Sequence, residues 1–224
     1  MQSLNIKITQ ILQKKRSWSQ LLLALAWFFL ATPCLVLGKP NITSIELETR
    51  AQQWHNLMTE ANRIPEWDKV VLVNNFFNQV QNKADRAVWQ RQEYWATPNE
   101  LINANAGDCE DIAIAKFFTL IKMGVPEDRL FLIYAKFYNA QKKTIEGHIV
   151  LSYQKERGSE FFILDNIHKT IGMASDFGNL IPVFVFNQNE VWSAHGFGPS
   201  TNLSFNVDLL ENWSDLKIRM ALHN

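Results

Sequence analysis

The spacing of hydrophobic residues changes near residue 125, and this change limits the folds that the chain can adopt. Before it, apolar residues recur every three or four positions, as in helices that bury one face. After it, they occur in short runs rich in β-branched and aromatic side chains, which is typical of strands. The sequence therefore predicts an α+β domain of N-terminal helices followed by an antiparallel sheet.

Two helices are predicted before residue 81. Thr43-Ser44-Ile45-Glu46 has the spacing of a capping box, and the helical pattern that follows it runs to Ala61. Pro65 is suited to open the second helix, because the first helical residue needs no backbone N–H. Its expected inward positions are Val70, Val73, Phe76, Phe77 and Val80.

The rest of the chain alternates between clear and weak patterns. Residues 94–107, with a proline and three asparagines, predict a loop. A third helix is expected from Cys109 to Gly124, because glycine commonly ends a helix. Strands are predicted at 130–138, 148–153, 161–164 and 183–186. The tail from Asn202 is weakly patterned and is interpreted as a terminal helix.

The first 38 residues have the pattern of a secretory signal peptide. A basic segment precedes the apolar stretch Leu21–Ala31, and Gly38 is the small residue expected at a cleavage site. An uncleaved membrane anchor is the alternative. However, the apolar stretch is short for a span of roughly 20 residues, and Pro33 interrupts it. We therefore expect residues 41–224 to form a single secreted domain.

Removal of this leader would leave an acidic domain with one cysteine. Five of the 22 basic residues and none of the 22 acidic residues lie in the first 40 positions, so 17 basic and 22 acidic residues remain. This balance argues against nucleic-acid binding, which requires basic surface. Cys109 has no partner for an internal disulfide, so its thiol is either a buried apolar group or a reactive one.

Cys109 lies in the sequence AGDCED, among the acids Asp108, Glu110 and Asp111. Negative neighbours oppose the thiolate, whereas the unpaired N–H groups at a helix N-terminus favour it. A nucleophile also needs a base, and His148 is the best candidate because it begins an apolar strand. His168 is a weaker rival, and the remaining histidines lie in the first helix or in weakly patterned regions: His55, His195 and His223.

Asp165 ends the strand after His148 and is the candidate for the group that orients the base. If the two strands form a hairpin with a tight turn at Glu156-Arg157, His148 and Asp165 are directly opposed, with Cβ atoms about 4.5–5.5 Å apart. A register slip of one residue would put them on opposite faces of the sheet. The alternative is a solvated aspartate at a strand end.

Four segments carry a resemblance to a known family. They are YWATPNE at 94–100, GDCEDIAIAKFFTL at 107–120, HIVLSY at 148–153 and ILDN at 163–166. In this order they resemble the bacterial transglutaminase-like cysteine peptidases, and the likeness covers most of residues 45–192. The resemblance implies a papain-like, transglutaminase-like α+β core. It also implies the roles of nucleophile for Cys109, base for His148 and third triad member for Asp165.

The resemblance further implies calcium dependence, with the ion carried by Asp108 and Glu110 and with Asp111 as a further candidate ligand. Physical chemistry agrees, because a bound cation reverses the effect of the acids on the thiol, and Ca²⁺ takes six to eight oxygen ligands. Asn103 and Asn105 are further candidate loop ligands. The alternative is that the three acids only stabilise the helix N-terminus.

Substrate and partners are implied in the same way. The periplasmic members that this chain resembles cut the N-terminal region of a large repeat adhesin at a di-alanine site and so control biofilm attachment. An inner-membrane receptor that senses cyclic di-GMP holds them. Trp95, in the first motif, is a candidate oxyanion donor through its indole, or alternatively a wall of the cleft or a core residue.

Two other functions use the same residues. A transglutaminase or amidase would transfer the acyl group on the same triad, and acceptance of amines would distinguish it. A non-catalytic, calcium-regulated binding module would need none of the three reactive side chains. The joint presence of Cys109, His148 and Asp165 argues against this second alternative.

Overall fold

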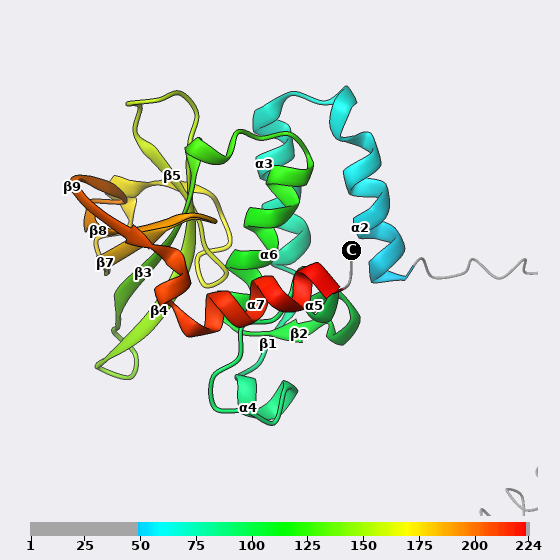
Figure 1. Ribbon diagram of the computed structural model, residues 1–224, viewed down its shortest axis with the longest axis horizontal. Helices are drawn as coiled ribbons and strands as arrows, with labels where there is room; N and C mark the ends of the chain where they lie inside the picture. The colour runs from blue at the N-terminus through cyan, green and yellow to red at the C-terminus, as the bar shows by residue number, and fades with distance from the viewer. Residues whose placement is uncertain (1–48, 223–224) are drawn as a thin grey trace, which may run out of the picture. The chain divides into compact units, whose positions relative to one another are not determined.

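The predicted change of period is present in the structure as a helical layer and a sheet (Figure 1). The computed structural model describes residues 49–222. Its helices are α2 (Arg50–Thr59), α3 (Glu66–Phe77), α4 (Asp85–Val88), α5 (Pro98–Ala104), α6 (Cys109–Lys122) and α7 (Glu211–Leu222). Its strands are β1 (Gln81–Asn82), β2 (Ala106–Gly107), β3 (Leu130–Asn139), β4 (Thr144–Gln154), β5 (Phe161–Leu164), β6 (Gly172–Met173), β7 (Leu180–Phe186), β8 (Glu190–His195) and β9 (Gly198–Asn206). The α+β prediction is confirmed.

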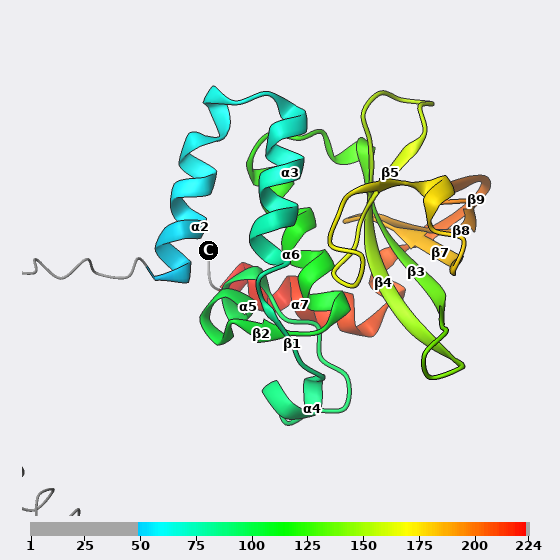
Figure 2. The same ribbon diagram turned by 180° about the vertical axis from the view of Figure 1, so that it is seen from behind.

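One antiparallel sheet carries seven of the strands, in the order β6-β5-β4-β3-β7-β8-β9. The long strands β3 and β4 lie near its centre, and Figure 2 shows β4 and β5 on the side that α3 and α6 approach. β1 and β2 form a separate parallel pair within the helical part. The sheet thus brings β4 and the end of β5, which carry two predicted site residues, next to the helices.

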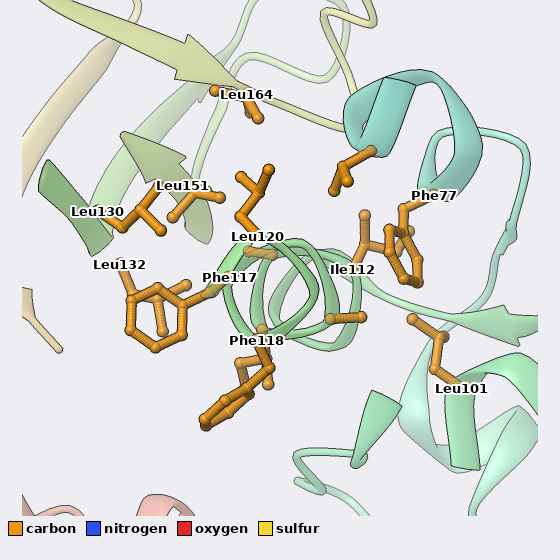
Figure 3. Packing of buried hydrophobic residues seen from close by; sticks show 14 of the residues in the cluster. Phe77, Leu101, Ile112, Phe117, Phe118, Leu120, Leu130, Leu132, Leu151 and Leu164 are labelled. Atoms are coloured by element: carbon orange, nitrogen blue, oxygen red, sulfur yellow. The ribbon is translucent and has the colours of Figure 1, made fainter. Parts of the chain in front are cut away.

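α6 is the central element of the fold. Ten of its fourteen residues, Asp111 to Leu120, are buried in an unbroken run, so the helix is enclosed on all sides. Figure 3 shows the helix end-on. Side chains on one side of it meet the sheet, and those on the other meet α3 and α5. The labelled residues of this packing are Phe77, Leu101, Ile112, Phe117, Phe118, Leu120, Leu130, Leu132, Leu151 and Leu164.

The second predicted helix is confirmed as α3, which begins directly after Pro65. Four of its five expected inward positions are buried, and Phe76 is half-buried. The capping box at 43–46 lies outside the described residues. The described part of the first helix begins at Arg50, with the Thr49 side chain accepting a hydrogen bond from the Gln52 N–H.

The prediction of a loop over residues 94–107 was wrong, because this stretch contains α5 and β2. Thr97 and Glu100 form a capping box, and Pro98 occupies the first helical position. Asn105 ends the helix in the left-handed conformation, with φ of 47°. The sequence Thr-Pro-Asn-Glu is a helix-start signal that the high asparagine content obscured.

The C-terminal region holds two strands that the sequence pattern did not predict. β8 and β9 pair as an antiparallel hairpin that extends the sheet, and β9 runs past Asn202 to Asn206. The predicted terminal helix is present as α7, from Glu211 to Leu222. Polar residues alternate with isolated hydrophobic residues in this hairpin, because the strands lie at the solvated end of the sheet.

The predicted leader, residues 1–38, lies outside the described residues. Among residues 49–222, no helix is both long enough and apolar enough to cross a membrane.

The start of α5 makes a stability prediction. Thr97→Ala removes the side-chain oxygen that accepts from the Glu100 N–H at 3.2 Å, so we expect a loss of about 1 kcal/mol in the free energy of unfolding, the usual cost of losing an N-cap. Urea denaturation would measure it. Thr49→Ala is the matched control, since it removes the N-cap of the peripheral helix α2. An unchanged midpoint for Thr97→Ala would contradict the assignment of this cap.

Candidate active site

Cys109 is the first residue of α6, as predicted. The residue is half-buried, and its thiol is free. The turn before it is fixed by Asp111, whose Oδ2 accepts the Asp108 N–H at 3.4 Å, and by the Ile112 N–H, which donates to the Asp108 carbonyl. Gly107 is required here, because an added Cβ would lie 2.6 Å from Asp111 Oδ2. The sulfur therefore lies at the positive end of the central helix.

The surroundings of the thiol are acidic, as the sequence suggested. The Cys109 thiol donates a hydrogen bond to Glu110 Oε2 at 2.9 Å. Burial, and then the negative charge of Glu110, raise the pKa of Cys109 well above its ordinary value. A hydrogen bond from the backbone N–H of Ile149, on β4, opposes this rise. The sulfur is therefore in contact with the strand segment that carries His148.

His148 and Asp165 form a buried hydrogen-bonded pair. His148 Nε2 lies 2.8 Å from Asp165 Oδ1, and the two residues are 3% and 1% exposed. The predicted proximity of these two side chains is confirmed. Because Nε2 is engaged with the carboxylate, Nδ1 is the ring nitrogen that remains for proton exchange with another group.

The register predicted for this hairpin was wrong by two residues. β4 and β5 pair Leu151 with Leu164 and Ser152 with Ile163, so the position opposite Asp165 is Val150 and not His148. The turn is longer than a tight Glu156-Arg157 turn, and Gly158 adopts φ of 83° in it. A shift of two residues keeps both side chains on one face, because side chains alternate with a period of two. The pair therefore meets diagonally across the strands.

Asp165 is held as a carboxylate by several donors. Burial alone would raise its pKa, but the hydrogen bond from His148 and the backbone N–H groups of His168 and Ile167 hold the pKa well below its usual range. His168, the rival base, contacts the other carboxylate oxygen through Nδ1 at 3.1 Å and is half-exposed. It lies behind Asp165 rather than beside the thiol. His55 and His195 are exposed, away from this site, and His223 lies outside the described residues.

A cleft of about 650 Å³ opens beside His148. Its lining residues are Glu93, Trp95, Glu110, Tyr134, Gly147, His148, Ile149, Phe184, Leu209, Leu210, Glu211 and Asn212. Trp95 is 8% exposed and stacks against Phe186, with ring centroids 5.7 Å apart. Trp95 is thus both a core residue and part of the cleft lining. These were two of the three alternatives predicted for it.

The cleft lining includes the start of α7, and Arg219 ties this helix to Trp95, another lining residue. Its guanidinium donates to the Trp95 carbonyl at 2.6 Å and to Glu100 Oε2 at 2.5 Å. It also lies over the ring of Tyr94, 4.4 Å from the centroid. The sequence pattern gave no indication of this contact, because the partners are more than 100 positions apart.

Five carboxylates gather at the N-terminus of α6. The predicted residues Asp108, Glu110 and Asp111 are joined there by Asp85 and Glu93, which sequence reasoning missed. Overlapping groups of these acids have oxygen atoms within 4.8 Å of one another: Asp85 with Glu93 and Glu110, and Asp85 with Asp108 and Asp111. Asp85 begins the short helix α4, in a segment with no recognisable ligand spacing, so only the fold brings it here.

The electrostatics of this cluster fit a bound cation. Burial raises the pKa of Asp85 to about 6, and burial together with the charge of Glu110 raises that of Asp108 strongly. Asp85 Oδ1 and Asp108 Oδ1 are buried and have no hydrogen-bond partner among the described residues. Oxygen ligands with no internal donor and strong mutual repulsion are suited to a hard ion such as Ca²⁺.

Asp111 differs from the other acids in the cluster. Its oxygens accept from the Ala96 N–H at 2.7 Å and from the Trp89 indole at 3.1 Å, in addition to the Asp108 N–H. Burial nevertheless raises its pKa to about 7. With three donors already bound, Asp111 mainly organises the loops around the cluster, which agrees with its lower place among the predicted ligands.

The two predicted asparagine ligands have different outcomes. Asn103 is exposed on α5 and lines a separate pocket with Ala51 and Trp54, so its role as a ligand stays a prediction without support from its position. It faces outward because α5 is a helix and not the expected loop. Asn105 ends α5, and its Oδ1 is buried without a hydrogen-bond partner among the described residues. It stays a candidate.

Comparison with known proteins identifies the family of this chain. Three structures of LapG from Legionella pneumophila match the chain at 35% sequence identity, each over 76% of this chain. The EGTA-treated form has a TM-score of 0.67 over 88% of its length, and the calcium-bound form has 0.63 over 89%. A search of curated proteins found no match. The family model of the bacterial transglutaminase-like cysteine proteinases matches residues 45–179. The chain therefore belongs to the bacterial transglutaminase-like cysteine proteinases.

Proposed function

We propose that this protein is a calcium-dependent cysteine endopeptidase in which Cys109 is the nucleophile, His148 the base and Asp165 the orienting acid. The observation that carries the proposal is the buried 2.8 Å hydrogen bond between His148 and Asp165. His148 lies on β4, and the residue after it, Ile149, contacts the Cys109 sulfur through its backbone N–H. A nucleophile, a base and a group that orients the base are the three parts that acyl transfer requires.

The reaction follows from these positions. The Cys109 thiol gives its proton to His148 Nδ1, because Nε2 is held by Asp165, and the sulfur attacks a peptide carbonyl carbon. The C–N bond then breaks, and His148 returns the proton to the departing amine. A thioester remains on Cys109. Water, deprotonated by His148, attacks this thioester and releases the acid product and the thiol.

The developing oxyanion needs hydrogen-bond donors. The Cys109 backbone N–H is one candidate, because N–H groups in the first turn of a helix have no intrahelical partner. The second is the indole of Trp95. Its ring lines the cleft, and packing against Phe186 together with the Arg219 contact to its carbonyl holds it in place. Donors fixed before the reaction stabilise the oxyanion without reorganising during the step.

Calcium would be held by Asp85, Glu93, Asp108 and Glu110, with Asp111 arranging the loops around it. When bound, the ion would supply positive charge that offsets the repulsion among these acids and lowers the pKa of the neighbouring thiol. Without such charge, Glu110 accepts the hydrogen bond of the thiol and opposes its ionisation. The likeness to a protein with a calcium-bound structure supports this part of the proposal.

For the substrate, we propose the N-terminal region of a large surface adhesin, cut at a di-alanine site in the periplasm. Its release from the cell would control biofilm attachment, and an inner-membrane cyclic-di-GMP receptor would sequester the protease. Support comes from the family motifs and from the signal-peptide pattern of residues 1–38. The acidic balance of the domain is consistent with a protein substrate and not with a nucleic acid.

A cleavage gel would test the function directly. Wild-type protein and Cys109→Ala would each be mixed with an adhesin N-terminal fragment containing a di-alanine site, with calcium or with EGTA. We expect one cut, made only by wild type with calcium. A matched fragment with the two alanines replaced by aspartates is the control for the site, and it should remain intact.

The other outcomes separate the alternatives. A cut that persists in EGTA would keep the peptidase and exclude the calcium requirement. Incorporation of an added amine in place of cleavage would indicate a transglutaminase. Absence of any cut, together with a Cys109 that does not react with iodoacetamide, would favour a binding module.

The two histidines bonded to Asp165 make a second prediction. His148→Ala should lower kcat by at least about 100-fold, the usual minimum for the loss of a general base. His168→Ala should lower it less than about tenfold, because His168 contacts only the far oxygen of Asp165. His195→Ala, at an exposed strand end, is the control. Equal losses for His148→Ala and His168→Ala would contradict the assignment of the base.

The acid cluster makes a third prediction, on stability. Calcium at 100 times its dissociation constant should add about 2.7 kcal/mol to the free energy of unfolding. This corresponds to a rise of about 5–10 °C in Tm for a chain of this size. Asp85→Asn should remove most of the rise, because Asp85 belongs to both overlapping acid groups. Asp68→Asn, an exposed acid on α3, is the control. An equal rise in Asp85→Asn would exclude Asp85 as a ligand.

A further inference from the structure

Lys116 is a fully buried lysine whose role the proposed mechanism does not explain. It lies on α6, in the middle of the hydrophobic core, with 0% of its surface exposed. Its Nζ donates to Asn74 Oδ1 at 2.9 Å and contacts the backbone carbonyl of Asp165 at 3.3 Å. A buried ammonium group is costly, so an apolar residue would serve better if packing were the only requirement.

Asn74 of α3 and Asn78, the residue that caps this helix, complete the polar cluster. Asn78 Nδ2 donates to the Asp165 carbonyl at 2.9 Å, so this carbonyl has both Asn78 and Lys116 as donors. Asn74 Nδ2 donates to the Lys169 carbonyl at 2.8 Å. The turn from Asp165 to Lys169 is therefore tied at both of its ends to buried side chains on the helical layer.

The carboxylate of Asp165 is fixed from the opposite direction. Oδ1 accepts from Ile167 N–H and faces His148 Nε2, and Oδ2 accepts from His168 N–H and faces the His168 ring. All of these partners except His148 belong to the turn itself. They therefore orient the carboxylate relative to the turn, but they do not fix the turn relative to Cys109. The polar contacts with Lys116 and the asparagines tie the turn directly to the helical layer, next to the core packing of Leu164.

Lys116 also shares a helix with the nucleophile. Cys109 and Lys116 are seven residues apart, which corresponds to two turns and about 10.5 Å along the axis, and both lie on one side of α6. One rigid helix therefore bears the thiol at its end and the group that holds the Asp165 carbonyl two turns later. Packing on all sides keeps this helix in place.

We propose that Lys116 is a positioning residue for the reaction: with Asn78 it holds the Asp165 carbonyl, and so sets the distance from α6 at which the carboxylate meets His148. The inference rests on the proposed function. A purely structural lysine would contribute to stability alone. A positioning lysine contributes little to stability and much to the rate.

The test compares Lys116→Met with the control Thr119→Val. Thr119 is buried on the same helix, but it accepts its hydrogen bond from the Trp54 indole, far from Asp165. In the presence of calcium, Lys116→Met should lower kcat for cleavage of the adhesin fragment by about 10–100-fold with KM unchanged, because a displacement of about 1 Å can have an effect of this size. Thr119→Val should lose stability but keep its kcat.

A spectroscopic measurement reports on the same contact without a substrate. The His148 N–H that is bonded to Asp165 should give a strongly downfield proton resonance, assigned by its loss in Asp165→Asn. We expect this resonance to broaden or move upfield in Lys116→Met and to persist in Thr119→Val. If wild type cuts nothing but this difference is present, the proposed function fails and the positioning role stands.

Wild-type kcat together with an unchanged resonance in Lys116→Met would overturn the proposal. If Lys116→Met does not fold, Asn78→Ala is the second variant, because it removes the other donor to the Asp165 carbonyl. Its kcat and its His148 proton resonance then test the proposal. An unchanged rate and an unchanged resonance in Asn78→Ala would then overturn it.

Thermal unfolding at two pH values shows whether the loss of rate is a loss of fold. Burial lowers the pKa of Lys116 to about 7, and the charge of Asp165 opposes this. At pH values between about 7 and the ordinary 10.5, the Lys116 amine is protonated in the unfolded chain and neutral in the folded one. The free energy of unfolding of the wild type therefore rises with pH in this range. At pH 6.5 Lys116→Met should have a Tm equal to or above wild type, and by pH 9 wild type should gain relative to it. A lower Tm for Lys116→Met at pH 6.5 would indicate a structural role instead.

Discussion

The rest of the structure depends on the burial of α6 along ten of its fourteen residues. A helix that is enclosed on all sides must be covered by other elements, so the sheet packs on one side of it and α3 and α5 on the other (Figure 3). Its N-terminus then lies where the hydrophobic core ends and the cleft begins. The thiol of Cys109, the imidazole on β4 and the acid cluster come together there because each lies at the edge of the same core.

Two buried aspartates illustrate how the protein controls charge in this region. Asp165 has a pKa well below its usual range, whereas the pKa of Asp85 is raised to about 6. Both are almost completely buried, so burial alone does not separate them. The hydrogen-bond donors differ: Asp165 has partners on both oxygens, whereas Asp85 has the Tyr94 N–H on Oδ2 and no partner on Oδ1 among the described residues. Asp165 thus has enough donors to outweigh the effect of burial on its pKa, and Asp85 does not.

The sequence was sufficient to predict features that depend on local spacing. The position of Cys109 at a helix start and the pairing of His148 with Asp165 followed from periodicity and turn signals. The pairing did so even though the register was two residues off, because an even shift preserves the face. Strand register itself depends on the conformation of a six-residue connection, which residue types alone do not specify.

Features that depend on distant segments could not be predicted. Asp85 and Glu93 reach the acid cluster only because α4 and the chain after it fold back on the start of α6. Lys116 occurs in an apolar helical pattern and gives no sign there of a contact with the Asp165 carbonyl, 49 positions away. The helix at 98–104 could have been predicted, because its capping box is visible in the sequence. The high asparagine content of the segment led instead to the prediction of a loop.

The contact of Arg219 with Trp95 has a consequence for how specificity and chemistry are divided along the chain. The family match ends at residue 179, so Cys109, His148 and Asp165 all lie within it. Leu210, Glu211 and Asn212 also line the cleft but lie beyond residue 179, and Arg219 of the same segment contacts the lining residue Trp95. The family model therefore covers the three proposed catalytic residues, whereas part of the cleft lining comes from the C-terminal segment beyond residue 179.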